Sequence, residues 1–501
     1  GGLPMATVYR KEDFSFTVDR DALIRRLGKA LKEDGLLVEE EAMRPYECDG
    51  LSAYRQLPLV VALPQTVAEV QAVLRICSEL KVPVVARGAG TSLSAGALPH
   101  PQGILLSMAR FNRIVDLDHQ RRLARVQPGV RNLAISEAAA PFGLYYAPDP
   151  SSQITCSIGG NVAENAGGVH CLKYGLTVHN VMAVTMVTIE GELVTLGSEA
   201  LDGPGYDLLA AITGSEGMLG VIVEVTVKLL PQPPSKDVLL AAFPEIEAAG
   251  HAVAGIIAAG IIPAGLEMMD NPAIRAAEDF VHADYPVDAA AILICELDGN
   301  PDEVRDQMAR VQALLKNFGA NDIRVAKNDE ERLRFWAGRK AAFPAVGRIS
   351  PDYYCIDGTI PRRQLAAVLK RMQELSEEYA LRIANVFHAG DGNLHPLVLY
   401  DGNVPGEFTR TEKLGGKILE LCVEAGGTVT GEHGVGMEKI NQMCVQFRTS
   451  ELNQFRALKA AFDPQGLLNP GKAIPTLNRC AEFGAMHVHN GQLPHPDIPR
   501  Y

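Results

Sequence analysis

The sequence predicts an α+β protein with two main domains, and three observations support this. The chain has 501 residues, enough for two large domains or about three ordinary ones. Short strands, glycine-rich loops and short helices run up to Leu230, whereas strands and helices alternate regularly afterwards. Gln232-Pro233-Pro234 marks the boundary between the two halves. We therefore expect a mostly helical lead-in at residues 1–54, a first domain at 55–233, a second domain at 234–475 and a surface tail at 476–501.

Residue patterns locate the elements of the first half. Apolar residues at helical spacing predict a helix over residues 20–36. Continuous apolar runs predict buried strands at 59–63 and 82–86. The segment between them opens with Pro64 and Thr66, which are helix-start residues, and predicts a helix over 67–80. A further strand is expected at 223–229.

The second half alternates between strands and helices, which predicts an α+β domain. Its strands are expected at 238–243, 266–269, 291–297 and 323–326, and its helices at 245–259, 272–281 and 302–318. The most apolar stretch, 248–266, contains His251 and Pro263. A buried helix that runs into a strand explains this stretch better than a membrane span. We therefore expect no transmembrane segment.

Charge and cysteine content restrict the class of protein. The net charge is −13 and no basic cluster stands out, which argues against nucleic-acid binding and against general affinity for anionic membranes. The nine cysteines form no CxxC pair and no four-cysteine iron–sulfur pattern. With no signal-peptide pattern, they predict a cytoplasmic protein with reduced thiols.

Three glycine-rich segments of the first domain point to a large, flat ligand. The first, residues 87–96, follows the predicted strand at 82–86. Its glycines let backbone N–H groups converge on a pyrophosphate, and Thr91 and Ser92 add hydroxyl donors. A simple tight turn is the alternative, and the segment lacks the spacing of a Rossmann fingerprint. The second and third segments span residues 148–168 and 214–222.

Two histidines frame a predicted hairpin in the second domain. Asp391-Gly392 is a strong signal for a type I′ turn. With these residues at the turn, His388 and His395 would lie directly opposite each other, with Cβ atoms about 4.5–5.5 Å apart. Glu432 would complete a His-His-Glu set, which is typical of a catalytic metal site with an open position. The alternative is that these are unrelated loop residues.

The glycine-rich segments resemble the FAD-binding domain of the vanillyl-alcohol oxidase / p-cresol methylhydroxylase (PCMH) superfamily. The resemblance implies a PCMH-type domain of two subdomains that binds FAD, followed by a ferredoxin-like α+β cap domain. Some members of the superfamily attach the flavin covalently through a histidine in the first segment. That segment has no histidine here, so we expect non-covalent FAD. The residues implied in cofactor binding are Arg87, Gly88, Ala89, Gly90, Thr91, Ser92, Leu93, Pro148, Asp149, Ser152, Ser157, Gly159, Gly160, Asn161, Ala163, Gly168, Val221, Ile222 and Asn469.

The later segments resemble the C-terminal domain of FAD-linked D-2-hydroxy acid dehydrogenases. This group includes D-lactate and D-2-hydroxyglutarate enzymes and the FAD subunit of bacterial glycolate oxidase, to which the stretch from Cys355 to Pro361 is most similar. The resemblance covers residues 50–475. It implies a divalent metal, with zinc as the expected ion, held by His388, His395 and Glu432.

The same resemblance implies roles for three further residues. His433 would act as the catalytic base. Arg339, which follows Trp336 as in the family's pattern, would hold the substrate carboxylate, with Arg348 as a second candidate. A charge on the surface of a helix is the alternative for Arg339.

The implied reaction is the oxidation of glycolate to glyoxylate by hydride transfer from C2 to flavin N5, with D-lactate as the second substrate. Enzymes that take D-2-hydroxyglutarate carry Lys and Asn for the distal carboxylate, whereas the matching residues here are Cys355 and Leu397. An unpaired buried carboxylate would be costly beside them, so we expect a short acid.

Alternative functions leave part of the sequence unexplained or differ in substrate. A D-lactate dehydrogenase acting alone and a D-2-hydroxyglutarate dehydrogenase are alternatives within the same family. A metal hydrolase leaves the glycine-rich segments unexplained, and a non-catalytic flavin scaffold leaves the His-His-Glu set unexplained.

Electrons from the reduced flavin need an acceptor. The resemblance implies partner subunits, one with iron–sulfur clusters and one FAD-like, or a quinone. We therefore expect a cytoplasmic protein, free or held by partners on the inner face of the membrane.

Overall fold

The computed structural model describes residues 15–200 and 203–486, which form two compact units. Unit 1 takes the chain up to Ala166, then Leu176–Pro231, and the part from His433 onward. Unit 2 takes Gly167–Gly175 and Gln232–Glu432. The sequence predicted a second domain that runs without interruption to residue 475. The structure differs, because residues after Glu432 pair with unit 1: Asn469 N donates to Val84 O at 2.8 Å.

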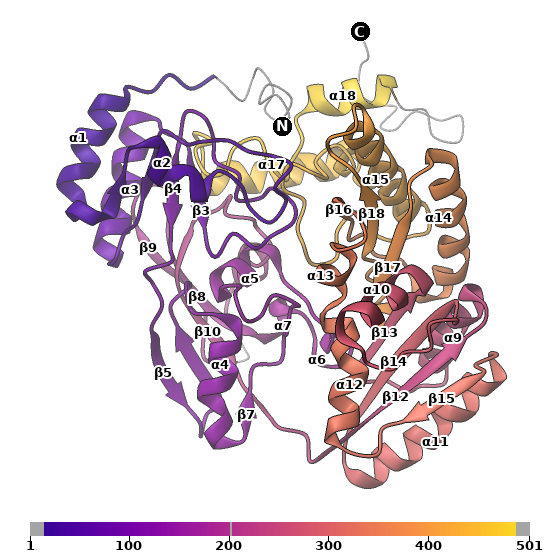
Figure 1. The fold of residues 1–501 in the computed structure, drawn as a ribbon. Coiled ribbons are helices and arrows are strands. Elements are labelled where there is room, and N and C mark those ends of the chain that lie inside the picture. Colours follow the sequence, from indigo (N-terminus) through magenta and orange to yellow (C-terminus); the bar gives the residue numbers. More distant parts are fainter. Residues whose placement is uncertain (1–14, 201–202, 487–501) are drawn as a thin grey trace. The chain divides into compact units, whose positions relative to one another are not determined.

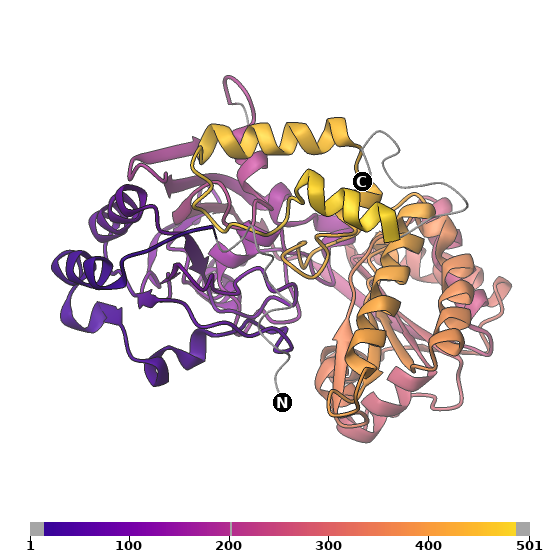
Figure 2. The ribbon, with the colours of Figure 1, turned by 90° about the horizontal axis from the view of Figure 1, so that it is seen from above.

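One sheet of unit 1 has mainly parallel strands. Its order is β1 (Leu36–Leu37), β2 (Val60–Ala62), β4 (Ile104–Ser107) and β3 (Val84–Arg87), and both β2 and β3 run parallel to β4. Helices α1 (Arg20–Ala30) and α3 (Val67–Leu80) lie side by side (Figure 2) and share its apolar core. The predicted helix at 20–36 ends early because Leu31 is extended, and a 3-10 turn leads into β1.

The second sheet of unit 1 is antiparallel. Its order is β5 (Ile114–Asp118), β6 (Leu123–Val126), β10 (Val221–Lys228), β8 (Val181–Val187) and β9 (Leu193–Gly197). Smaller elements complete this unit: α2 (Glu40–Met43), α4 (Asn132–Ala139), α5 (Ile158–Glu164), α7 (Thr177–Asn180), α8 (Leu208–Ile212), and the strand pair β7 (Leu144–Tyr145) and β11 (Leu230–Pro231).

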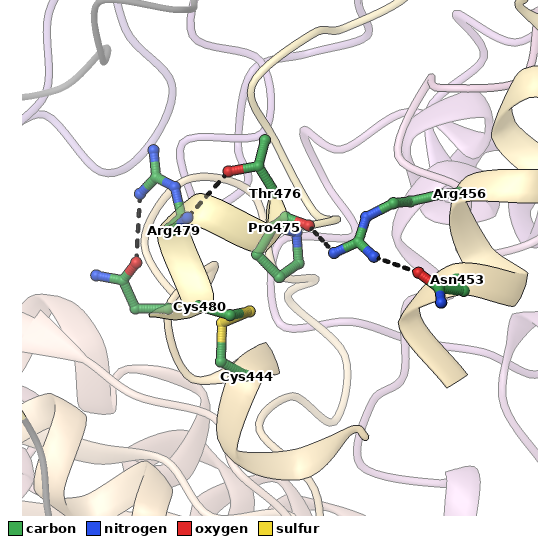
Figure 3. Close-up of a disulfide and its surroundings, with 8 residues drawn as sticks. Cys444, Asn453, Arg456, Pro475, Thr476, Arg479 and Cys480 are labelled. Carbon is green, nitrogen blue, oxygen red and sulfur yellow. Dashed lines mark hydrogen bonds between the residues drawn. A yellow bond between two sulfur atoms is a disulfide. The ribbon is translucent and has the colours of Figure 1, made fainter. Parts of the chain in front are cut away.

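A disulfide fastens the C-terminal helices of unit 1. These are α16 (Met443–Gln446), α17 (Thr449–Phe462) and α18 (Leu477–Met486). Cys444 and Cys480 are bonded across 36 residues (Figure 3), and both are buried in an apolar cluster with Leu452 and Phe483. The prediction that all cysteines are reduced is therefore wrong for this pair. Part of the predicted surface tail is thus an anchored helix, while residues 487–501 lie outside the described range.

Unit 2 is built on one seven-stranded antiparallel sheet, which Figure 1 draws in red to orange. Its order is β15 (Asp322–Val325), β12 (Ser235–Phe243), β14 (Ala291–Gly299), β13 (Gly265–Asp270), β17 (Ile383–Phe387), β18 (Pro396–Tyr400) and β16 (Asp352–Cys355). Each strand predicted for this half appears in it.

The helices of unit 2 pack in two groups. Helix α9 (Ile246–Ala258) contacts α11 (Pro301–Asn317) and α14 (Leu365–Tyr379), and α14 contacts α15 (Glu407–Glu424). A second group consists of α10 (Asn271–Val281), α12 (Asp329–Lys340) and α13 (Ala342–Val346), and the short α6 (Cys171–Tyr174) adds to the unit.

The apolar stretch at 248–266 forms part of α9 and the start of β13, as predicted. In the described part of the chain, no helix has the length and apolar character needed to cross a membrane.

Asp270 joins two elements of unit 2 in a buried environment. Its carboxylate accepts hydrogen bonds from Ala273 N at the start of α10 (3.3 Å) and from Asn385 Nδ2 on β17 (2.9 Å). Burial raises the pKa of Asp270 to about 7 despite these hydrogen bonds. In an unfolded chain the pKa of an aspartate is about 3.9. Folding therefore favours the protonated form of this group.

This shift predicts a stability difference between the wild type and Asp270→Asn. Below about pH 4, Asp270 of the wild type is protonated in both the folded and the unfolded protein. Its full contribution to the free energy of unfolding is then present. Between about pH 4 and 7 the unfolded state ionises first, so wild-type stability falls by about 1.4 kcal/mol per pH unit relative to the uncharged variant. Melting temperatures from pH 4 to 8 should show the variant gaining on the wild type, with the gain levelling off above pH 8. A constant difference would contradict the buried carboxyl.

The disulfide predicts the number of titratable thiols. Seven of the nine cysteines are free. Denatured protein should therefore give seven thiols with Ellman's reagent before reduction and nine afterwards. Cys480→Ser is the matched control: it should give eight in both cases, because Cys444 has lost its partner. Nine thiols in unreduced wild-type protein would contradict the cross-link.

Candidate functional site

The three glycine-rich segments meet in unit 1. A Cβ added at Gly88 would lie 2.2 Å from Ser157 Oγ, so the first and second segments are in close contact. The third segment hydrogen-bonds to the second, since Gly214 N donates to Val162 O (2.7 Å) and Glu216 N donates to Ala163 O (2.8 Å). Segments far apart in sequence thus converge around α5.

The C-terminal part of the chain closes this arrangement. Asn469 Nδ2 donates to Gly96 O (3.2 Å) and to Glu216 O (2.6 Å), which links the first and third segments. Lys472 is fully buried, and its Nζ also donates to Gly96 O, at 3.1 Å. The predicted cofactor residue Asn469 therefore lies with the glycine-rich segments although it follows them by about 250 residues or more.

Individual residues of the segments have defined partners. Arg87 Nη1 donates to Cys48 O (2.6 Å), and the guanidinium lies over its own loop at Gly90. Asn132, which the sequence did not single out, donates to Asn161 Oδ1 (2.9 Å) and to Pro148 O (3.1 Å). Its signal was weak, since an asparagine near the start of a helix is usually a cap.

The other predicted cofactor residues follow the same segments, with one exception. Gly168 belongs to unit 2, because residues 167–175 make their contacts there. The remaining ones lie in unit 1: Ala89, Thr91, Ser92, Leu93, Asp149, Ser152, Gly159, Gly160, Val221 and Ile222.

The predicted His-His-Glu set forms a compact, buried cluster in unit 2. Glu432 Oε1 lies 3.3 Å from His388 Nε2 and 3.1 Å from His395 Nε2. The two imidazole rings are 4.8 Å apart at their centres. One ligand atom from each of the three residues lies within 4.8 Å of the others, a spacing that can hold a metal ion. The histidines lie at the ends of neighbouring strands, β17 and β18.

The predicted hairpin register is wrong, yet the histidines still meet. A 3-10 turn at Ala389–Asp391 connects the strands, and of the two predicted turn residues only Gly392 has a positive φ, whereas a type I′ turn needs both. His388 therefore pairs with Asn393, not with His395. The pairing is shifted by two residues. Because side chains alternate along a strand, a shift of two keeps both imidazoles on one face.

A buried carboxylate that the sequence analysis missed supports this cluster. Glu267 on β13 lies 2.8 and 3.0 Å from His388 Nδ1 through its two oxygens, and Arg339 Nε donates to Glu267 Oε1 at 2.9 Å. Relative exposures are 1% for Glu267, 2% for Arg339 and 4% for His388. This burial excludes the reading of Arg339 as a surface charge. The available signal was an acidic residue in the middle of an apolar run, since Glu267 is flanked by Leu266 and Met268.

Neighbouring charges in the cluster shift the pKa values of His388 and Glu432. Burial lowers the pKa of His388, but the carboxylates of Glu267 and Glu432 overcome this and raise it well above its usual value. Burial raises the pKa of Glu432, but His388 and His395 overcome this and hold it well below its usual value. Without a metal ion, His388 and Glu432 therefore form a buried ion pair.

A second missed carboxylate fixes the backbone that carries Glu432. Asp357 is fully buried, and its Oδ2 accepts hydrogen bonds from Glu432 N (2.8 Å) and Gly431 N (3.1 Å). Asp357 Oδ1 accepts from Thr430 Oγ1 at 3.1 Å. The stretch around Asp357 was noticed only for its family resemblance, and its hydrogen-bonding role could not be read from that pattern.

The remaining predicted catalytic residues lie in different settings. His433 is half-buried and belongs to unit 1, where Ser92 Oγ donates to its carbonyl oxygen at 3.4 Å. Trp336 donates from Nε1 to Glu296 Oε1 at 3.2 Å in unit 2. Arg348 is exposed and lies over the ring of Phe280, 5.2 Å from its centre. Its role as a carboxylate ligand stays a prediction that these contacts do not support.

The chain matches known protein families and individual relatives in sequence. Residues 232–473 match the family described as FAD linked oxidases, C-terminal domain, and residues 58–197 match the FAD binding domain family. The chain is 66% identical to glycolate oxidase subunit GlcD of Escherichia coli (strain K12), with 97% of each chain covered. It is 39% identical to GlcD of Bacillus subtilis (strain 168), over 85% of this chain and 91% of that one. A D-lactate dehydrogenase of Archaeoglobus fulgidus is 32% identical, over 83% and 92%.

The fold is also found in solved structures. A structure of p-cresol methylhydroxylase with bound substrate has a TM-score of 0.78 at 17% identity and covers 94% of this chain and 99% of that one. This likeness confirms the predicted PCMH-type fold. The sequence matches show that the chain belongs to the family of FAD-linked oxidases that includes the glycolate oxidase GlcD subunits and D-lactate dehydrogenases.

Proposed function

We propose that this protein oxidises glycolate to glyoxylate with FAD as cofactor, and D-lactate to pyruvate as a second reaction. The observation that carries the proposal is the buried link from Arg339 through Glu267 to the His388, His395 and Glu432 cluster. It joins a cation suited to a carboxylate with residues suited to a metal ion. The chain is more similar in sequence to the GlcD subunits than to the D-lactate dehydrogenase of Anaerostipes hadrus, which favours glycolate over D-lactate.

The cluster residues fit a divalent metal ion, and zinc suits two imidazoles and a carboxylate. If His388 donates its Nδ1 proton to Glu267, its Nε2 lone pair faces Glu432, and His395 Nε2 faces the same carboxylate. When bound, such an ion lowers the pKa of the substrate hydroxyl.

Two of the chain's own residues would then act on the substrate. Arg339 binds the substrate carboxylate through its terminal nitrogens, because Glu267 holds its Nε. His433 takes the proton of the C2 hydroxyl as general base. The glycine-rich segments would hold FAD, which would supply the acceptor for the hydride from C2. The oxidised acid leaves, and His433 returns its proton to water.

Two residues near the cluster favour a short substrate. Cys355 on β16 lies directly opposite Leu397 on β18, and Leu397 lies two residues after His395, so its side chain points to the same face of the strand. Both are buried. Neither side chain can pair with a second carboxylate, whose burial without a partner is costly. This supports glycolate and D-lactate over D-2-hydroxyglutarate.

Electrons would leave the flavin through partners. We expect further subunits, one with iron–sulfur clusters and one FAD-like, or a quinone, because GlcD is named as a subunit of glycolate oxidase. Through such partners, we expect the protein to be held on the cytoplasmic side, at the inner face of the membrane.

Substrate-dependent bleaching of the flavin tests the proposal. FAD-loaded protein is mixed anaerobically with glycolate, D-lactate, L-lactate or D-2-hydroxyglutarate, and the absorbance near 450 nm, typical of flavins, is followed. We expect fast bleaching by glycolate, slower bleaching by D-lactate and little by the other two. A yellow protein that none of the acids bleaches would contradict the proposed reaction, and faster bleaching by D-2-hydroxyglutarate would contradict the argument from Cys355 and Leu397.

Metal content tests the cluster independently of turnover. We expect about one zinc ion per chain by elemental analysis and loss of that ion in His395→Ala. Glu267→Ala should weaken metal binding by about 10–100-fold, because ligand-orienting carboxylates typically contribute this much. His251→Ala, on the exposed side of α9, is the matched control and should keep the ion. Equal metal content in the wild type and His395→Ala would contradict the site.

A further inference from the structure

The chain passes from one unit to the other between Glu432 and His433. The proposed metal ligand thus belongs to unit 2, while the proposed base next to it belongs to unit 1. On the unit 2 side, Asp357 fixes the backbone at Glu432. The contacts of the loop that follows His433 therefore decide where the base is held in unit 1.

Glu216 binds two backbone N–H groups of this loop. Its Oε1 accepts a hydrogen bond from Gly436 N at 2.7 Å, and its Oε2 accepts one from Val435 N at 3.2 Å. Both bonds are buried. A carboxylate that accepts two successive backbone N–H groups restrains the position and direction of that backbone. The restrained residues lie two and three positions after His433.

Glu216 is itself rigidly placed. It lies in the third glycine-rich segment, its N donates to Ala163 O in α5, and its carbonyl accepts from Asn469 Nδ2 at 2.6 Å. Its φ of 54° is unusual for a residue with a side chain, which indicates that the surroundings determine its conformation. The anchor of the loop is therefore built into the cofactor-binding segments.

The loop is also tightly packed against other parts of unit 1. A Cβ added at Gly434 would be 1.7 Å from Glu164 Oε2, and one added at Gly436 would be 2.1 Å from Ser94 O. Met437 N donates to Ser94 O at 3.1 Å. Glycines allow this close approach, and Glu216 supplies the directional bonds.

We propose that Glu216 is a positioning residue for the base: it holds the loop after His433 on the FAD-binding segments, so that the imidazole is presented at a fixed place relative to the cofactor. This inference rests on the proposed function for the role of His433, but the anchor can be tested without it. Because Glu216 acts through His433, its loss should lower the rate of flavin reduction and leave cofactor and substrate binding largely unchanged.

The kinetic test compares Glu216→Ala and Glu216→Gln in anaerobic stopped-flow bleaching with glycolate. Both variants should retain FAD at wild-type stoichiometry and a half-saturating glycolate concentration within about threefold. The limiting rate should fall about 100-fold in Glu216→Ala, a loss typical of a misplaced catalytic group. Glutamine keeps an acceptor for Gly436 N and should recover part of the rate. Glu224→Ala, on β10 of the same unit, is the matched control and should behave as wild type.

A double-mutant cycle separates positioning from general damage. In His433→Ala, which removes the proposed base, adding Glu216→Ala should change the residual rate by less than about threefold, because residues that act as one unit are not additive. Additive losses, a wild-type rate in Glu216→Ala, or loss of FAD in both Glu216 variants would each overturn the positioning role.

Hydrogen exchange tests the anchor without any substrate. Mass spectrometry of wild type and Glu216→Ala should show faster exchange in peptides covering residues 433–438 and unchanged exchange in peptides from β14 of unit 2. Unchanged exchange at 433–438 would overturn the anchor. Faster exchange in a protein whose wild type is not bleached by any 2-hydroxy acid would support the anchor and overturn the proposed function.

Discussion

The peptide bond between Glu432 and His433 is the constraint on which the proposed chemistry depends. Two buried carboxylates hold the backbone on either side of it: Asp357 binds the N–H of Glu432, and Glu216 binds the N–H groups of Val435 and Gly436. A metal ligand and a base that are neighbours in sequence are in this way fixed by different units. Each of the two residues therefore depends on hydrogen bonds within its own unit.

A third buried carboxylate, that of Glu267, positions two side chains of the cluster in unit 2. Glu267 binds Arg339 and His388 at once, so the group proposed for the substrate carboxylate and a group proposed for the metal share one support. Such a charge is stable in the interior only while its partners are present. The cluster therefore needs positive charge on both sides of Glu267, and a substitution at any member alters the electrostatics of the others.

Much of the fold could be predicted from local sequence patterns. The buried carboxylates that position the site residues could not. Helix α3 and the strands β12, β13 and β14 follow from periodicity and capping residues within their own segments, and the family motifs located His388, His395 and Glu432. The groups bound by the carboxylates of Glu267, Asp357 and Glu216 within the site lie 72 to 220 residues away in sequence, and no local pattern indicates such a pairing. The same holds for Cys444 and Cys480. The hairpin register failed because a 3-10 turn competed with the expected two-residue turn.

The division of unit 1 into pieces before and after unit 2 has a consequence for biosynthesis. Domains tend to fold as they leave the ribosome, the first one first. Here the larger part of unit 2 is complete once Glu432 has been made, whereas unit 1 still lacks the strand-like pairing at Val84 and the closing contacts of Asn469 and Lys472. The unit that begins the chain is thus the last whose residues are all made, so its cofactor-binding segments lack their closing contacts until after unit 2 has been synthesised.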